Sequence, residues 1–123
     1  MALWVKKVIN DKLDEFLSDD YRSKFKLSED DIEYIKNNGM INIRNEVKNI
    51  IIKRIASDFI FFDGEQTPLE GNLIYIAQHA TGTCCRKCLY RCHGILINKR
   101  LSNNEINYIV LIIMTWIERQ LYE

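Results

Sequence analysis

The sequence predicts a single, mainly α-helical domain of about five helices, with a short strand or irregular loop region and a Cys/His-rich segment. Apolar residues recur every three or four positions along most of the 123-residue chain, as one face of a helix requires. Serine and glycine stand at several expected helix ends, and the chain contains only one proline. The length suits one ordinary domain, and a hydrophobic content of 47% excludes a disordered chain.

The N-terminal part, residues 1–57, is expected to contain three helices. The first covers residues 2–17, where apolar residues at helical spacing alternate with charged ones. The second begins at a capping box opened by Ser28 and ends near Gly39, which suits a left-handed helix end. The third covers residues 41–56 and carries one apolar face.

A loop and a helix are expected in the middle of the chain, over residues 58–94. Turn-forming residues gather in residues 58–72, which predicts a loop. We interpret the short apolar run at residues 73–77 as a strand, although its length also allows a buried helical turn. Thr83 is expected to cap a helix over residues 84–92, and Gly94 is expected to end it.

The last helix is expected over residues 103–121, beginning at a capping box of Ser102 and Glu105. Because it is apolar nearly all round, it either lies at the centre of the fold or forms half of a homodimer interface. Its longest apolar run, residues 106–117, is shorter than the roughly 20 residues that span a bilayer. Residues 1–10 lack the apolar run of a signal peptide, so we expect a cytoplasmic protein without membrane contact.

The residues with the most reactive chemistry gather in one short segment. All four cysteines lie within nine residues, and both histidines of the chain flank them. A disulfide framework would spread its cysteines through the fold, whereas a metal site gathers them. Zinc binds four such ligands tetrahedrally, and mixed sulfur and nitrogen ligation suits it. We therefore expect a zinc site, with candidate ligands His79, Cys84, Cys85, Cys88, Cys92 and His93.

Two other interpretations of the cysteines stay open. Free cysteine is often a small buried residue of the core, without chemical function. Alternatively, Cys84 or Cys85 is a reactive thiolate, stabilised by the helix N-terminus and by the basic side chains of Arg86 or Lys87. His79 would then be the nearby base. The adjacent cysteines make an iron–sulfur cluster geometrically awkward.

The net charge of zero conceals an uneven distribution of charge. Between residues 71 and 104 there are five basic residues and no acidic ones, while the rest of the chain has 12 basic against 17 acidic residues. This pattern predicts an anionic partner, either nucleic acid or an acidic protein surface. Simple solvation of these side chains is the alternative. The candidate partner-binding residues are Arg86, Lys87, Arg91, Lys99 and Arg100.

A set of short motifs is distributed over residues 64–95. The motifs are Gly64-Glu65-Gln66-Thr67-Pro68, Gly71, Ala77-Gln78-His79-Ala80-Thr81, Thr83-Cys84-Cys85-Arg86, Cys88-Leu89 and His93-Gly94-Ile95. Together they resemble the hallmark of a small bacterial and phage family that is known only as a domain of unknown function, and the resemblance extends over about residues 25–117. The resemblance implies one domain with a special site, and it implies no particular activity.

The resemblance also orders the candidate ligands. The family has an aromatic residue where this chain has Cys92, which ranks Cys92 last among them. The resemblance then implies a site drawn from His79, Cys84 or Cys85, Cys88 and His93. Polar residues of the same block would orient these ligands. They are Gln66, Thr67, Gln78 and Thr81.

Three classes of function remain open at this point. The first is a small zinc-binding module that binds nucleic acid or a nucleoprotein through its basic segment. The second is a small enzyme that depends on a metal with an open position or on a reactive cysteine. The third is a phage or mobile-element protein that inhibits or scaffolds another protein through direct contact.

Overall fold

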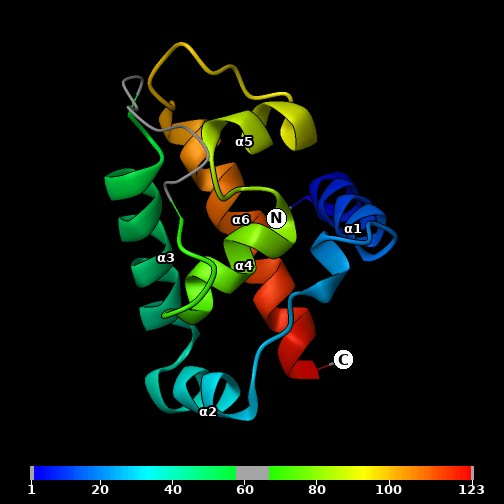
Figure 1. Ribbon diagram of the computed structural model, residues 1–123, viewed down its shortest axis with the longest axis vertical. Helices are drawn as coiled ribbons and strands as arrows, with labels where there is room; N and C mark the ends of the chain where they lie inside the picture. The colour runs from blue at the N-terminus through cyan, green and yellow to red at the C-terminus, as the bar shows by residue number, and fades with distance from the viewer. Residues whose placement is uncertain (1, 58–66, 123) are drawn as a thin grey trace.

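The computed structural model describes residues 2–57 and 67–122, which form six α-helices, one short 3₁₀-helix and no strand (Figure 1). The elements are α1 (Leu3–Leu17), η1 (Arg22–Lys24), α2 (Glu29–Asn38), α3 (Met40–Arg54), α4 (Leu73–Thr81), α5 (Arg86–His93) and α6 (Asn103–Tyr122). The expectation of a mainly helical protein is confirmed. Within the described ranges, no helix is both long and apolar enough to cross a bilayer.

Helix α6 is the central element of the fold. Helices α1, α3 and α4 all pack against it (Figure 1). Ile109, Ile112 and Ile113 are completely buried, and Trp116 is only 7% exposed. Burying one such side chain stabilises the folded state by roughly 1.5–3 kcal/mol. One side of α6 is therefore part of the protein's own core, while Tyr108, Leu111 and Met114 are only partly buried.

Both capping boxes expected from the sequence are present. Ser28 accepts a hydrogen bond from the backbone N–H of Asp31, whose side chain accepts one from the backbone of Ser28. Ser102 and Glu105 form the same pair of bonds, at 3.1 and 2.8 Å, before α6. Each box satisfies backbone N–H groups that the first helical turn leaves without partners. These serines therefore set the start of α2 and α6.

The expectation of a strand at residues 73–77 is wrong, because this run is the first half of α4. The side chain of Asn72 accepts a hydrogen bond of 2.9 Å from the backbone N–H of Ile74 and caps the helix. Gly82 ends α4 in the left-handed conformation, with φ +69°. The helical periodicity becomes visible only when the run is extended to Thr81, beyond the apolar residues that suggested a strand.

Helix α5 begins later than the sequence suggested. Its N-cap is Cys85, whose sulfur accepts a hydrogen bond of 3.4 Å from the backbone N–H of Cys88. Thr83 does not cap this helix, since its hydroxyl instead lies 3.0 Å from that of Thr81. The expected end at Gly94 is confirmed, with a left-handed φ of +70°. Cys84 and Cys85 therefore lie directly before Arg86, the first residue of α5.

A close contact sets the distance between α4 and α5. A β-carbon added to Gly82 would lie 2.7 Å from the sulfur of Cys92, which is too close for any real side chain. Glycine is therefore required here both for its positive φ and for this contact. The contact places the last turn of α5 directly against the end of α4.

The side chain of Arg86 holds α5 in place from inside the protein. It is only 1% exposed, contrary to its expected role as a partner-binding residue. Its Nη1 donates a hydrogen bond to the carbonyl of Ser57 at 2.8 Å. Its Nη2 donates to the carbonyls of Leu96 and Lys99, both at 2.7 Å. Arg86 thus connects α5 to the segment after α3 and to the turn before α6.

We expect replacement of Arg86 by alanine to destabilise the protein strongly. The substitution leaves several buried carbonyls without donors, so the free energy of unfolding should fall by about 3 kcal/mol or more. Urea denaturation measures the change. The neighbouring, exposed Lys87 provides the matched control, because Lys87→Ala should change the free energy by less than about 0.5 kcal/mol. Equal effects of the two substitutions would contradict the structural role of Arg86.

Candidate metal centre

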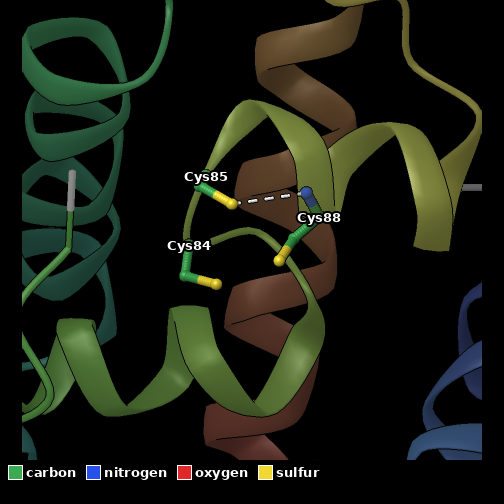
Figure 2. A group of neighbouring side chains, drawn as sticks. All are labelled: Cys84, Cys85 and Cys88. Atoms are coloured by element: carbon green, nitrogen blue, oxygen red, sulfur yellow. Dashed lines mark hydrogen bonds between the residues drawn. The ribbon is translucent and has the colours of Figure 1, made fainter. Parts of the chain in front are cut away.

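The sulfur atoms of Cys84, Cys85 and Cys88 form a compact group in which all three lie within 4.8 Å of one another. Figure 2 shows the three side chains pointing toward a common space between the α4–α5 turn and the first turn of α5. Tetrahedral zinc, with sulfur ligands at about 2.3 Å, separates its sulfurs by about 3.8 Å. The observed spacing is therefore compatible with metal binding after small shifts of the side chains.

The guanidinium group of Arg22, from η1, lies against this cysteine cluster. Its Nη2 donates a hydrogen bond of 3.4 Å to the sulfur of Cys88, and its Nη1 lies 4.0 Å from the sulfur of Cys84. Nη1 also donates to the backbone carbonyl of His79. Among the described residues, no carboxylate forms an ion pair with Arg22. The nearest groups able to carry a balancing negative charge are the thiols.

The environment of the cluster shifts the pKa values of its thiols in opposite directions. The pKa of Cys88 is lowered to about 2, because the thiols of Cys84 and Cys85 donate hydrogen bonds to its sulfur and Arg22 adds a positive charge. The pKa of Cys84 is raised, because its thiol is the donor in these bonds and because it is buried. One negative charge is therefore favoured on Cys88, next to the guanidinium.

Thr67 connects the cysteines to His79. Its hydroxyl donates a hydrogen bond of 2.7 Å to the backbone carbonyl of Cys84. Its own carbonyl lies 3.1 Å from Nε2 of His79. Thr67 was expected to orient the ligands, and the structure places it in contact with the backbone of one of them.

His79 is buried beside the cysteine cluster but is not part of it. Because Nε2 lies 3.1 Å from the carbonyls of both Thr67 and Pro68, this nitrogen carries the proton. Phe25 stacks on the ring, with 5.4 Å between the ring centres. Nδ1 is buried and has no hydrogen-bond partner among the described residues. His79 therefore keeps one unused lone pair in a side chain that is 94% buried.

His93 uses both ring nitrogens in hydrogen bonds away from the cysteine cluster. Nε2 lies 2.7 Å from the carbonyl of Thr81 and is therefore the protonated nitrogen. Nδ1 accepts a hydrogen bond of 2.8 Å from the hydroxyl of Tyr108. Burial lowers the pKa of His93 to about 4, so the ring is neutral at pH 7. His93 connects the end of α4 to α6.

The remaining polar residues expected around the site support the α4–α5 turn. Gln78 is completely buried, and its amide donates a hydrogen bond of 3.3 Å to the carbonyl of Thr83. The hydroxyl of Thr81 donates to the carbonyl of Ala77 at 2.8 Å. Gln66 lies outside the described residues. Gln78 therefore contacts the backbone of the turn that precedes Cys84, and the Thr81 hydroxyl contacts the side chain of Thr83 in that turn.

Four of the five basic residues expected to contact a partner are exposed. They are Lys87, Arg91, Lys99 and Arg100. The ammonium group of Lys99 lies 3.9 Å from the carboxylate of Glu105, a distance at which an exposed pair contributes little. The other three extend from α5 or from the turn that follows it. Exposed positive charge is therefore carried by α5 and by the turn that follows it.

Comparison with known families places this site within a shared domain. A family model described as a domain of unknown function, DUF4186, matches residues 10–118. The chain belongs to this family. No solved structure matches the chain. The DUF4186 match includes the three clustered cysteines, both histidines and Arg22.

Arg22 was not predicted to lie at the cysteine cluster. It is 62 residues away from Cys84 along the chain, in a stretch rich in charged residues where no single one stands out. No local pattern indicates such a contact. In the DUF4186 fold, the packing of η1 against α4 brings Arg22 to the cysteines.

We expect the buried His93 to make stability depend on pH. Its pKa of about 4 in the folded state is below the ordinary value of 6.5, so the unfolded state binds the proton first as the pH falls. Stability should be complete above about pH 6.5 and decrease by about 2 to 3 kcal/mol between there and pH 4.

Urea denaturation of wild type and His93→Gln at several pH values isolates this contribution. All other titrating groups are common to the two proteins, so their effects cancel in the difference. The difference in the free energy of unfolding between the wild type and His93→Gln should shrink as the pH falls. Only the wild type loses the contribution of a neutral imidazole. A difference that stays constant from pH 7 to pH 4 would contradict the lowered pKa.

Proposed function

We propose that the protein is a small zinc-binding module in which Cys84, Cys85 and Cys88 are thiolate ligands. The observation that carries the proposal is the convergence of three sulfurs against the guanidinium of Arg22. Buried cysteines that serve only as core residues do not require a cationic neighbour. A metal thiolate site does, because it carries excess negative charge.

The charges of such a site are balanced by residues of the chain. Three thiolates and one zinc dication leave a net charge of −1, which Arg22 neutralises. Thiolates select soft or borderline metals, and zinc favours the tetrahedral geometry that three clustered cysteines begin to form. Zinc is therefore the ion we propose. A site of reduced thiols also fits the reducing environment of a cytoplasmic protein.

The fourth ligand decides whether the zinc is structural or catalytic. A structural site has four protein ligands, and His79 is the described residue best suited to complete it, because its buried Nδ1 has no hydrogen-bond partner within residues 2–57 and 67–122. His93 is less suited, since both of its ring nitrogens already form hydrogen bonds. We propose His79 as the fourth ligand, which requires its ring to approach the cysteines when the ion binds.

A zinc ion at this position would fix the α4–α5 turn and thereby the orientation of α5. The exposed basic residues Lys87 and Arg91 extend from this helix, and Arg100 lies in the segment before α6. We propose that this side of the protein binds nucleic acid, as a polyanion that matches its charge. The role of the metal is then to hold a binding surface in shape.

A metal-dependent enzyme is the second candidate, and one observation favours it. Only three cysteine sulfurs form the cluster, which leaves one coordination position for water. Catalytic zinc sites keep such a position, and the bound water becomes acidic enough to act as a nucleophile. The identity of the fourth ligand therefore separates the two candidates.

We expect the purified, untagged protein to contain close to one equivalent of zinc. Serine in place of Cys84, Cys85 or Cys88 should reduce the zinc content at least tenfold, because a hydroxyl is a poor ligand for this ion. Elemental analysis by mass spectrometry measures the metal. Cys92→Ser is the matched control, since this thiol lies on the same helix but outside the group of three.

Full zinc content in all three cysteine variants, or a wild type without metal, would refute the proposal. If Cys92→Ser lost as much zinc as the other variants, the proposed set of ligands would be wrong, because Cys92 would also contribute to zinc binding. Chelation should also lower the denaturation midpoint, because zinc binding and folding are coupled.

Cobalt substitution tests the fourth ligand. The visible absorption of bound Co²⁺ depends on the identity and number of its ligands, so His79→Ala should change the spectrum of the substituted protein. His93→Ala should leave the spectrum unchanged. A spectrum that is insensitive to His79 but changes when an anion such as azide is added would favour an open site and the enzyme candidate.

A further inference from the structure

The exposed side of α5 combines positive charge with an aromatic ring. Lys87, Tyr90 and Arg91 follow helical spacing on this side, and Tyr90 is 53% exposed. Tyrosine is often buried, with a hydrogen-bond partner for its hydroxyl, whereas the ring of Tyr90 lies on the surface. The structure therefore presents an aromatic ring between two cations.

The turn that follows α5 extends the same kind of surface. Leu96 and Ile97 are 52% and 41% exposed, and two basic residues, Lys99 and Arg100, follow them. The buried guanidinium of Arg86, the first residue of α5, donates hydrogen bonds to the carbonyls of Leu96 and Lys99. The turn is therefore attached to α5, and the two segments lie side by side at one end of the molecule (Figure 1).

We propose that this surface, formed by α5 and residues 96–100, binds single-stranded nucleic acid. The inference rests on the proposed function, because it assumes that the metal centre holds α5 in place. The cations would contact phosphate groups, and Tyr90 would stack on a base. Leu96 and Ile97 would contact further bases, whose faces are exposed only in a single strand.

The shape of α5 favours a single strand over a duplex. A helix that enters the major groove projects from its protein and presents several side chains to the base edges. Helix α5 has only eight residues, and Arg86 and Leu89 on its inner side are completely buried or nearly so. The helix therefore lies against the fold along its inner side and exposes only a narrow outer side. Such a surface can support unstacked bases but cannot fill a groove.

The composition of the surface favours nucleic acid over an acidic protein. Residues 71–104 include no carboxylate that could pair with a basic residue of a partner protein. An aromatic ring flanked by cations is the arrangement that binds bases and phosphates together. An acidic peptide would use the cations alone and would leave Tyr90 without a role.

Fluorescence anisotropy with a labelled 20-nucleotide oligothymidine provides the test, and a duplex of the same length is the comparison. The wild type should bind the single strand at least fivefold more tightly than the duplex. Tyr90→Ala should weaken single-strand binding about fivefold or more, because stacking of one base contributes about 1–3 kcal/mol. Tyr90→Phe should retain binding, since the ring and not the hydroxyl supports the base.

Charge reversal on the same surface should have a larger effect. Arg91→Glu combined with Arg100→Glu should weaken binding more than tenfold and reduce its dependence on salt concentration. Lys36→Glu is the matched control, because Lys36 is exposed on α2 at the opposite end of the molecule (Figure 1). This control should bind as the wild type does.

Zinc content is measured for every variant, so a failure of the surface can be distinguished from a failure of the metal centre. Zinc-loaded wild type that binds neither oligonucleotide overturns the inference and leaves the metal site intact. Equal binding of strand and duplex, or full binding by Tyr90→Ala, also overturns it. Binding of a polyglutamate peptide that matches or exceeds binding of the oligonucleotide would assign the surface to an acidic protein instead.

Discussion

The contacts of the Arg86 guanidinium are the interaction on which the rest of the molecule depends. Its N–H groups hold α5 against the segment after α3 and against the turn before α6. Because Cys84 and Cys85 come immediately before Arg86 in the chain, the same contacts determine where their sulfurs lie. A buried cation is costly unless its donors are satisfied, and here backbone carbonyls satisfy several of them. The cysteine cluster and the exposed basic residues of α5 therefore both depend on how this one helix is anchored.

Much of the helical fold follows from local sequence patterns. The capping boxes at Ser28 and Ser102 fixed the starts of α2 and α6, because a side chain that satisfies the first backbone N–H groups acts within four residues. Helix α4 was mistaken for a strand, since it is buried on most sides and so lacks the alternation of polar and apolar residues that reveals a surface helix. The central position of α6 follows from its nearly uniform apolar character.

The candidate site was predictable only where its residues are close in sequence. The clustering of the cysteines in the sequence made Cys84, Cys85 and Cys88 candidates, and the structure groups these three without Cys92. The histidines looked equivalent in the sequence, yet the hydrogen bonds of His93 occupy both of its nitrogens whereas His79 keeps one free lone pair. Such a distinction depends on tertiary contacts. The same is true of Arg22, which joins the cysteines from a distant segment.

The placement of charge at opposite ends of the molecule gives it a preferred direction in an external field. Helix α2, with acidic residues throughout its first turn, lies at the end opposite α5 (Figure 1). A molecule with this dipole rotates as it nears a polyanion, so that its basic end arrives first, within the roughly 10 Å over which charges act at 0.1 M salt. For the proposed nucleic-acid ligand, zero net charge would then limit long-range, non-specific adhesion, while the orientation of the encounter would still be selected before contact.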